Sequence, residues 1–377
     1  MRKAASVLAL LLILSMVLPA VSIPSVWAAE DSWTILAPPS EFATFIGAAE
    51  VDEKIYLISS NVTKQYTLET NTWTAKSPLP IYNGWAAVVA CQNKIYVIGG
   101  NAEVPTQVYD PATDTWENRT SIPETKGVYA NVVDDKIYLI GGIYPAFLQQ
   151  VFASPTNDVY DPETDSWSRM APMPTPVMGY ASAVVDNKIY IIAGGTTTTL
   201  PGEPTNKVQI FDPETNQWTN GTSIPTGVCY AKACATTGLL APKRIYVVGG
   251  ALNYNLRGRP TYIDITQVYD PETDSWSVAA STPITFTSFA LVNVNDELYA
   301  VGLYRDPTGD YFAPSFPASA KYTPLGYIPE FPSWIILPLL LTSTLLIILC
   351  RRKLTKTPSQ QSYLEPNSSA MLKTVFF

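Results

Sequence analysis

The chain of 377 residues contains no histidine. Imidazole is a frequent general base near neutral pH and a common metal ligand, so its absence excludes the enzyme classes and metal sites that depend on it. Charged residues are also scarce, at 15% of the chain against about 25% in typical globular domains. The chain has 32 prolines, which interrupt helices and favour turns. This composition predicts a fold rich in loops and poor in helix.

Motifs of familiar chemistry are missing as well. The chain has no phosphate-binding loop, no G-x-S-x-G nucleophile turn and no paired-cysteine zinc motif. Carboxylates recur in segments such as Asp161–Asp165, but these segments lack the glycine and the distal glutamate of an EF-hand calcium loop. We interpret them as turns, and we expect no catalytic residue, no metal ion and no cofactor.

The N-terminal segment has the layout of a secretory signal peptide. Arg2 and Lys3 precede an apolar run from Ala4 to Leu18, and a stretch of small residues follows up to Ala28. The run is short for a helix that crosses a bilayer, which needs about 20 apolar residues. We therefore expect cleavage after Ala28 rather than a retained anchor.

A second apolar segment lies near the C-terminus. Residues Trp334 to Cys350 carry no charge, and Arg351, Arg352 and Lys353 follow directly. Under the positive-inside rule, this pattern predicts one transmembrane helix with its C-terminal side in the cytoplasm. The preceding segment Ile328–Trp334 is similar to the Pro-Glu-Phe signals of archaeal surface proteins, which a sortase-like protease can process. Because 24 residues follow Lys353, we favour a retained anchor.

The part of the chain between these segments is strongly acidic. Without residues 1–28 and 351–377, 17 basic and 31 acidic residues remain, which gives a net charge of −14. Such a surface repels phosphate backbones, so we expect no nucleic-acid partner. The predicted organisation is a signal peptide (1–28), an extracellular domain (29–326), a linker (327–333), a transmembrane helix (334–350) and a cytoplasmic tail (351–377). This places the protein in the plasma membrane as a single-pass protein.

A repeated unit occupies most of the extracellular part. Each unit has an apolar strand, a Lys-Ile-Tyr strand that ends in Gly-Gly, a Val-Tyr-Asp-Pro strand and a strand with tryptophan. Four full copies contain KIYVIGG (94–100), KIYLIGG (136–142), KIYIIAGG (188–195) and RIYVVGG (244–250), and two weaker copies flank them. The tryptophans of consecutive units from Trp73 to Trp276 lie 43 to 58 residues apart.

These units resemble the kelch repeat, whose period is about 50 residues. The resemblance covers nearly all of residues 30–326 and implies an all-β fold, a six-bladed β-propeller with one four-stranded sheet per blade. The sixth unit lacks a tryptophan strand, whereas the chain begins with an unpaired one around Trp33. We therefore expect residues 31–37 to supply the outer strand of the last blade, which closes the ring and removes open sheet edges.

Antiparallel strands place the connections between strands 2 and 3 on the same face as those between strand 4 and the next strand 1. Four of the strand 2 to 3 connections are long, and long loops inside a regular repeat are usually binding elements. Their aromatic and arginine side chains suit ligand contacts. The candidate ligand-binding residues are Tyr82, Trp85, Tyr144, Phe147, Tyr254, Arg257, Arg259, Tyr262, Tyr304 and Arg305. The opposite, short-turn face is expected to look toward the membrane.

The kelch resemblance favours a non-catalytic binding or adhesion module at the cell surface, with an extracellular protein or glycan as partner. One alternative is a carbohydrate-active enzyme of the sialic-acid-mutarotase kind, which could use arginines without histidine. Another is a passive structural component of the cell envelope. Asn61, Asn118 and Asn220 begin glycosylation sequons, which predicts a glycoprotein.

Overall fold

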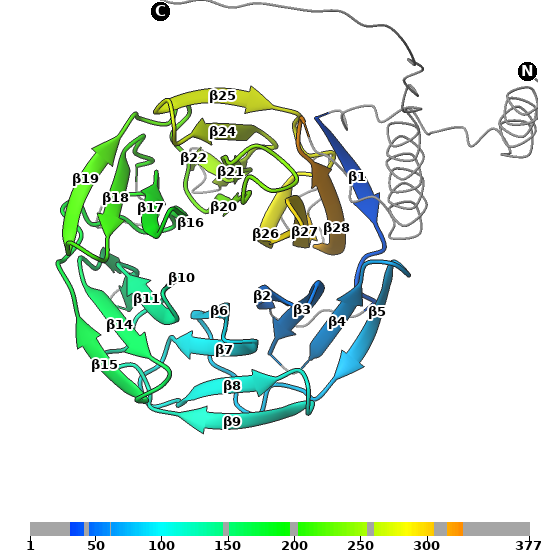
Figure 1. Cartoon of the computed structure of the whole chain (residues 1–377), viewed down its shortest axis with the longest axis vertical. Coiled ribbons are helices and arrows are strands. Elements are labelled where there is room, and N and C mark those ends of the chain that lie inside the picture. Colours follow the sequence, from blue (N-terminus) through cyan, green and yellow to red (C-terminus); the bar gives the residue numbers. More distant parts are fainter. Residues whose placement is uncertain are drawn as a thin grey trace, which may run out of the picture. The chain divides into compact units, whose positions relative to one another are not determined.

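The computed structural model describes residues 31–40, 45–60, 62–145, 151–196, 203–254, 260–304 and 315–326. Within them, six four-stranded antiparallel sheets stand around a central axis and form a six-bladed β-propeller (Figure 1). The predicted fold class is therefore confirmed for this part of the chain. The predicted signal peptide and the predicted membrane helix lie outside the described residues, and within those residues no helix has the length and apolarity needed to span a membrane.

The strands of each blade are numbered from the axis outward. Blade 1 contains β2 (Phe45–Val51), β3 (Lys54–Ser59), β4 (Thr63–Thr67) and β5 (Thr72–Lys76). Blade 2 contains β6 (Ala86–Cys91), β7 (Lys94–Gly99), β8 (Thr106–Asp110) and β9 (Thr115–Arg119). Blade 3 contains β10 (Ala130–Val133), β11 (Lys136–Ile140), β14 (Asn157–Asp161) and β15 (Ser166–Arg169).

The second half of the ring repeats this plan. Blade 4 contains β16 (Ala181–Val185), β17 (Lys188–Ile192), β18 (Val208–Asp212) and β19 (Gln217–Gly221). Blade 5 contains β20 (Lys232–Ala235), β21 (Ile245–Val248), β24 (Thr266–Asp270) and β25 (Ser275–Ala279). Blade 6 contains β26 (Phe286–Val294), β27 (Glu297–Tyr304), β28 (Phe316–Thr323) and the N-terminal β1 (Ser32–Leu36).

The apolar core lies between neighbouring blades. Strand 2 of blade 2 is buried from Ile95 to Gly99, because both of its faces are covered. Ile98 of blade 2 packs in one cluster with Leu139 and Tyr160 of blade 3, and similar clusters fill the other blade junctions. The outer strands are half exposed, and their tryptophans are partly buried. The blades therefore depend on one another for burial.

A polar contact, called the latch below, repeats between all six pairs of neighbouring blades. Between blades 1 and 2, the Trp116 indole donates to the carbonyl of Ser77 at 2.9 Å, and the Ser77 amide donates to Asp114 Oδ1 at 2.9 Å. The Tyr109 hydroxyl donates to the same carboxylate oxygen at 2.6 Å. The backbone residues held in this way are Ala37, Ser77, Thr120, Ala171, Thr222 and Ala280. The latch fixes the angle between blades.

The N-terminal strand closes the ring with the same contact. Strand β1 pairs antiparallel with β28, and Trp33 lies opposite Tyr322. The Trp33 indole donates to the carbonyl of Ala280 at 2.9 Å, and the Ala280 amide donates to Asp31 at 2.9 Å. The prediction that the N-terminal strand completes the last blade is therefore confirmed, and the closure is as well bonded as the other junctions.

Candidate functional site

The insertion face is the end of the propeller formed by the connections between strands 2 and 3 and between strand 4 and the next strand 1. In blade 3 the strand 2 to 3 connection contains a hairpin, β12 (Ile143–Pro145) with β13 (Val151–Ala153). In blade 5 it contains β22 (Ala251–Tyr254) with β23 (Pro260–Tyr262). The short-turn face, at the other end, has four-residue turns such as 111–114. Two of the long connections thus include strands of their own, which the sequence did not indicate.

The aromatic ridge consists of Ile81, Tyr82 and Trp85, in the connection between blades 1 and 2. Their side chains are 41%, 48% and 62% exposed. Large apolar residues that are exposed this close together in the chain are candidates for contact with a partner. Tyr82 and Trp85 were both predicted as binding residues, and the structure places them together on the insertion face.

Buried polar side chains hold the ridge at both ends. Asn83 is only 2% exposed, and its amide donates to the carbonyl of Gly99 at 2.6 Å and accepts from the Asn101 amide at 2.9 Å. At the other end, the Gln107 side chain accepts from the Ile81 amide at 2.8 Å and donates to the Ile81 carbonyl at 2.7 Å. The backbone under the exposed side chains is therefore fixed.

The backbone of Trp85 is held in a costly conformation. Its φ of 68° lies in the left-handed region, which costs a residue other than glycine of order 1–3 kcal/mol. The Trp85 carbonyl accepts from the Val128 amide at 3.2 Å, and Gly127 leaves room for the side chain, since a Cβ there would lie 3.3 Å from Trp85 Cβ. The equivalent positions of blades 4 and 5, Gly179 and Tyr230, have φ of 60° and 61°, so this conformation belongs to the repeat. At Trp85 it carries an exposed indole.

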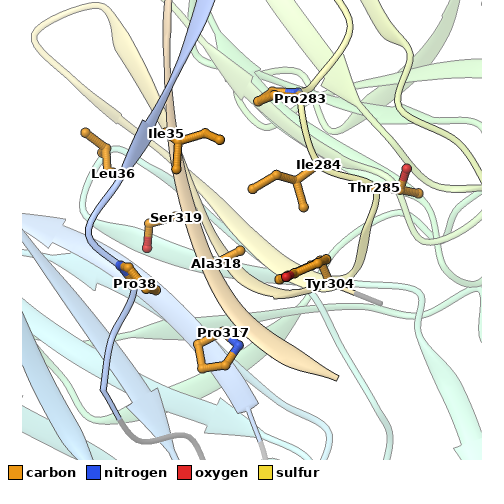
Figure 2. Close-up of a pocket in the computed structure, with 10 residues that line it drawn as sticks. All are labelled: Ile35, Leu36, Pro38, Pro283, Ile284, Thr285, Tyr304, Pro317, Ala318 and Ser319. Atoms are coloured by element: carbon orange, nitrogen blue, oxygen red, sulfur yellow. The ribbon is translucent and has the colours of Figure 1, made fainter. Parts of the chain in front are cut away.

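A pocket of about 400 Å³ lies at blade 6 (Figure 2). Three segments line it: the end of β1, the connection between blades 5 and 6, and the start of β28 with Tyr304 at the end of β27. Figure 2 shows Ile35 and Ile284 on opposite sides of this space, with Tyr304 below them. The lining residues are Ile35, Leu36, Pro38, Pro283, Ile284, Thr285, Tyr304, Pro317, Ala318 and Ser319. The wall is mostly aliphatic and prolyl, and Tyr304 also packs on exposed Phe316 with ring centroids 5.8 Å apart.

A buried ion pair near this face has a structural role. Lys126 is fully buried and donates to Asp158 Oδ2 at 2.7 Å, while Arg169 Nε donates to Asp158 Oδ1 at 2.8 Å. Burial lowers the pKa of Lys126, and the bond to Asp158 opposes that shift. Blades 2, 4 and 5 have glutamine at the position of Asp158, and there it bonds the backbone of the preceding connection. The pair therefore replaces a glutamine contact that holds a loop.

The structure describes six of the ten predicted binding residues. Tyr82, Trp85 and Tyr304 border exposed apolar features, and Tyr262 is partly buried in a hairpin strand. Tyr144 lies opposite Phe152 in the ladder of the first hairpin, and Tyr254 lies opposite Pro260 in the second. Four predicted residues lie outside the described residues: Phe147, Arg257, Arg259 and Arg305. The structure does not test their proposed contacts.

The structure describes two of the three predicted glycosylation sites. Asn118 and Asn220 lie on the outer strands β9 and β19, and both are exposed. Asn61 lies outside the described residues. Glycosylation at these positions remains a prediction.

Several residues of the ridge and of the region around the blade 6 pocket were not singled out from the sequence, among them Ile81, Ile35, Ile284 and Phe316. Apolar residues next to prolines, as in Pro283–Ile284 and Phe316–Pro317, were the available signal. Among the described residues, no group of three Cys, Asp or Glu side chains is placed to hold a metal ion.

Comparison with known proteins agrees with the fold and with the repeat. Kelch-like protein 35 of Mus musculus is 35% identical over 160 residues, which are 41% of this chain and 26% of that protein. Kelch-like protein terF of Aspergillus terreus is 27% identical over 300 residues, which are 70% of this chain and 60% of that protein. The chain thus spans less than two thirds of the length of either relative.

A solved structure titled "Structure of YjhT" superposes with a TM-score of 0.59 at 18% identity, covering 74% of this chain and 95% of that chain. At this identity the likeness shows a shared fold alone. The family model described as the KLHDC2/KLHL20/DRC7 Kelch-repeats domain matches residues 40–250 and 87–302. With six such blades, a tryptophan latch at every junction and this match over most of its length, the chain belongs to the kelch-repeat family.

Proposed function

We propose that the protein is a non-catalytic binding module that uses its insertion face to hold a protein partner. The observation that carries this proposal is the aromatic ridge, where three exposed apolar side chains stand on a backbone fixed by Asn83 and Gln107. Kelch propellers typically serve as protein-interaction modules, which agrees with this assignment. The activities of the longer relatives are not transferred to this chain.

A rigid aromatic ridge is well suited to binding. Tyrosine and tryptophan provide the largest single contributions in many protein interfaces. Side chains that already stand in place lose little conformational entropy on binding, so more of the contact energy appears as affinity. The ridge therefore supports the role of an anchor for a partner.

The pocket beside Tyr304 offers a second contact for the same partner. Its aliphatic and prolyl wall suits an apolar side chain, since the hydroxyl groups of a sugar would lose hydrogen bonds to water there without enough replacements. We therefore favour a protein over a glycan as the partner. A glycan remains the alternative that the experiment below distinguishes.

We further propose that the protein acts at the cell surface, as a single-pass membrane protein with the propeller outside. Support comes from the apolar run before Ala28, and from the uncharged segment Trp334–Cys350 with basic residues after it. Protease added to intact source cells is expected to cleave the propeller and to spare the tail after Lys353.

The partner class is tested with the labelled full-length chain, purified in detergent and applied to intact source cells. Saturable binding that disappears after protease treatment of the cells, and survives glycan removal, is the expected result. Trp85→Ala is expected to weaken binding by at least about tenfold, because loss of an interface anchor costs 2 kcal/mol or more. Val278→Ala, which changes an equally exposed residue on an outer strand, is the control and is expected to bind normally. Binding lost only on glycan removal would assign a glycan partner instead.

A further inference from the structure

The axis of the propeller holds a small cavity of about 180 Å³. Residues from the innermost strands of all six blades line it, and all of these residues are described. Most of the wall is alanine, glycine or serine, which keeps the cavity open. Two larger side chains in its wall stand out by their chemistry, because both are polar and partly accessible: Tyr129 and Lys232.

The sheet registers show how unusual Lys232 is at its level of the channel. Lys232 lies opposite Val248, and the equivalent positions in four other blades are Gly47, Ala87, Ala181 and Ala290. In blade 3 the equivalent residue is Tyr129, which directly precedes β10. Small residues therefore surround one lysine and one tyrosine.

Lys232 and Tyr129 meet across the channel. The ammonium of Lys232 lies 4.5 Å from the centroid of the Tyr129 ring, and these residues belong to blades 5 and 3, which are not neighbours. Tyr180 of blade 4 packs on Tyr129 with centroids 4.9 Å apart. Tyr180 itself is fully buried, so it supports the Tyr129 ring from behind. Lys232 and the Tyr129 ring form one polar spot in the channel.

No acidic side chain of the described residues forms a salt bridge with Lys232, unlike Lys126, whose ammonium is paired with Asp158. Burial lowers the pKa of Lys232 to about 8, so the amine remains mostly protonated at neutral pH. A cation with only an aromatic ring as partner gains from any anion that enters.

The walls of the channel supply further donors. The innermost strands, β2, β6, β10, β16, β20 and β26, each pair with a neighbour on one side only. The other edge of each strand faces the axis and carries backbone N–H groups without a sheet partner. These groups and one ammonium make the channel suitable for a single negative charge.

We propose that the central channel binds one small organic monocarboxylate, with its carboxylate on Lys232 and its apolar part against Tyr129. A cavity of about 150 Å³ holds benzene, so a molecule of the size of benzoate fits the available space. The site lies at the axis and uses none of the ridge residues, so it goes beyond the proposed partner binding and can fail or hold independently of it.

Calorimetric titration of the full-length chain in detergent tests the site, with sodium benzoate as the probe. One benzoate per chain is expected to bind saturably. Benzyl alcohol, which lacks the charge, and inorganic phosphate, which lacks the ring, are both expected to bind more weakly. Absence of saturable benzoate binding, or tighter binding of either control compound, overturns the proposal.

Substitutions and the pH dependence of benzoate binding test whether Lys232 supplies the positive charge. Lys232→Met is expected to lose benzoate binding, whereas Lys188→Met, which removes an exposed lysine from β17, is expected to keep it. Lys232→Arg keeps a permanent charge, so its binding is expected to persist at pH 9.5. In the natural chain, affinity is expected to fall by up to about tenfold per pH unit as the pH rises above the pKa of unliganded Lys232, about 8. Equal binding by Lys232→Met, folded by circular dichroism, contradicts the assignment.

Discussion

The two faces of the propeller differ in how regular their connections are. On the short-turn face, blades 1 to 5 join strands 3 and 4 by nearly the same turn, and an Asp or Asn in a left-handed conformation, such as Asp114, Asp165 or Asn216, joins the latch. On the insertion face the connections differ in length and carry exposed aromatic side chains. Regularity at one end holds the ring together, and this leaves the other end free to vary.

Blade 4 differs from other blades in the side chains of its latch. Its latch has Phe211 where Tyr109, Tyr160 and Tyr269 stand in other blades, and Asn216 where those blades have aspartate. The phenylalanine cannot donate to a carboxylate, and the neutral amide does not need that donor. The bond from the Ala171 amide to Asn216 is kept at 2.7 Å. Blade 1 shows an intermediate case, because its Tyr66 hydroxyl donates to the amide oxygen of Asn71 at 2.7 Å.

The largest expected effect comes from replacing one aromatic residue by alanine on each face of the propeller. Tyr109→Ala removes a fully buried ring from the latch and is expected to lower the free energy of unfolding by about 3–5 kcal/mol, as for other buried aromatic residues. Trp85→Ala removes a larger but exposed ring and is expected to change it by less than about 0.5 kcal/mol. Urea denaturation of the full-length variants measures both values. Similar losses for the two variants would show that the ridge is part of the structural framework.

A smaller effect tests the latch itself. Tyr109→Phe removes only the hydroxyl that donates to Asp114 and is expected to cost about 1 kcal/mol. Adding Asp114→Asn, which copies the pair in blade 4, is expected to recover part of that loss. The same denaturation curves give the coupling between the two positions. If the double variant loses the full sum of the two single losses in the free energy of unfolding, the two positions are not coupled, and the residues in blade 4 do not compensate for each other.

The smallest effect is the response to acid. Hydrogen bonds from Tyr109 and from the Ser77 amide lower the pKa of Asp114, and bonds at the equivalent positions oppose burial and lower the pKa of Asp165 and of Asp274. A carboxyl with a lowered pKa stabilises the fold above its unfolded pKa of about 3.9, and this stabilisation is lost as the pH falls through the folded value. Unfolding between pH 5 and pH 2 is therefore expected to become easier.

Asp114→Asn is the variant that isolates this response. An amide does not titrate, so the free energy of unfolding of the variant is expected to fall less steeply with decreasing pH than that of the natural chain. Glu103→Gln, an exposed change on the insertion face, serves as the control. Parallel curves for the natural chain and Asp114→Asn would contradict the role of ionised Asp114.

The repeat made much of the fold predictable. The tryptophan spacing gave the blades, and the unpaired segment around Trp33 gave the closure, because a missing strand at one end matched a surplus strand at the other. The insertion face followed from antiparallel strand order. These predictions depend on local sequence and on topology, which a single chain displays directly.

Contacts between distant segments were harder to predict. The pocket at blade 6 joins Ile35, Ile284 and Pro317, and no sequence pattern connects these positions. Lys232 lies in a strand whose neighbours are small, and only the registers reveal that Tyr129 shares its level in the channel. The hairpins inside the long connections were also missed, because their strands have only three or four residues.

One residue on the short-turn face provides the sharpest comparison with the ridge. Leu239 is 83% exposed, and its amide is held by Asp296, which also accepts from the amides of Leu240 and Ala241. It is thus another exposed apolar side chain on a fixed backbone, at the opposite end of the propeller. A difference between Leu239 and Trp85 reports on the face and not on exposure or rigidity.

The most direct test of the central claim is the affinity of full-length Trp85→Ala and Leu239→Ala for intact source cells, measured side by side with the natural chain. If the insertion face holds the partner, Trp85→Ala weakens binding by at least about tenfold and Leu239→Ala leaves it unchanged. Loss of binding in Leu239→Ala, with normal binding by Trp85→Ala, would place the partner on the short-turn face and contradict the account.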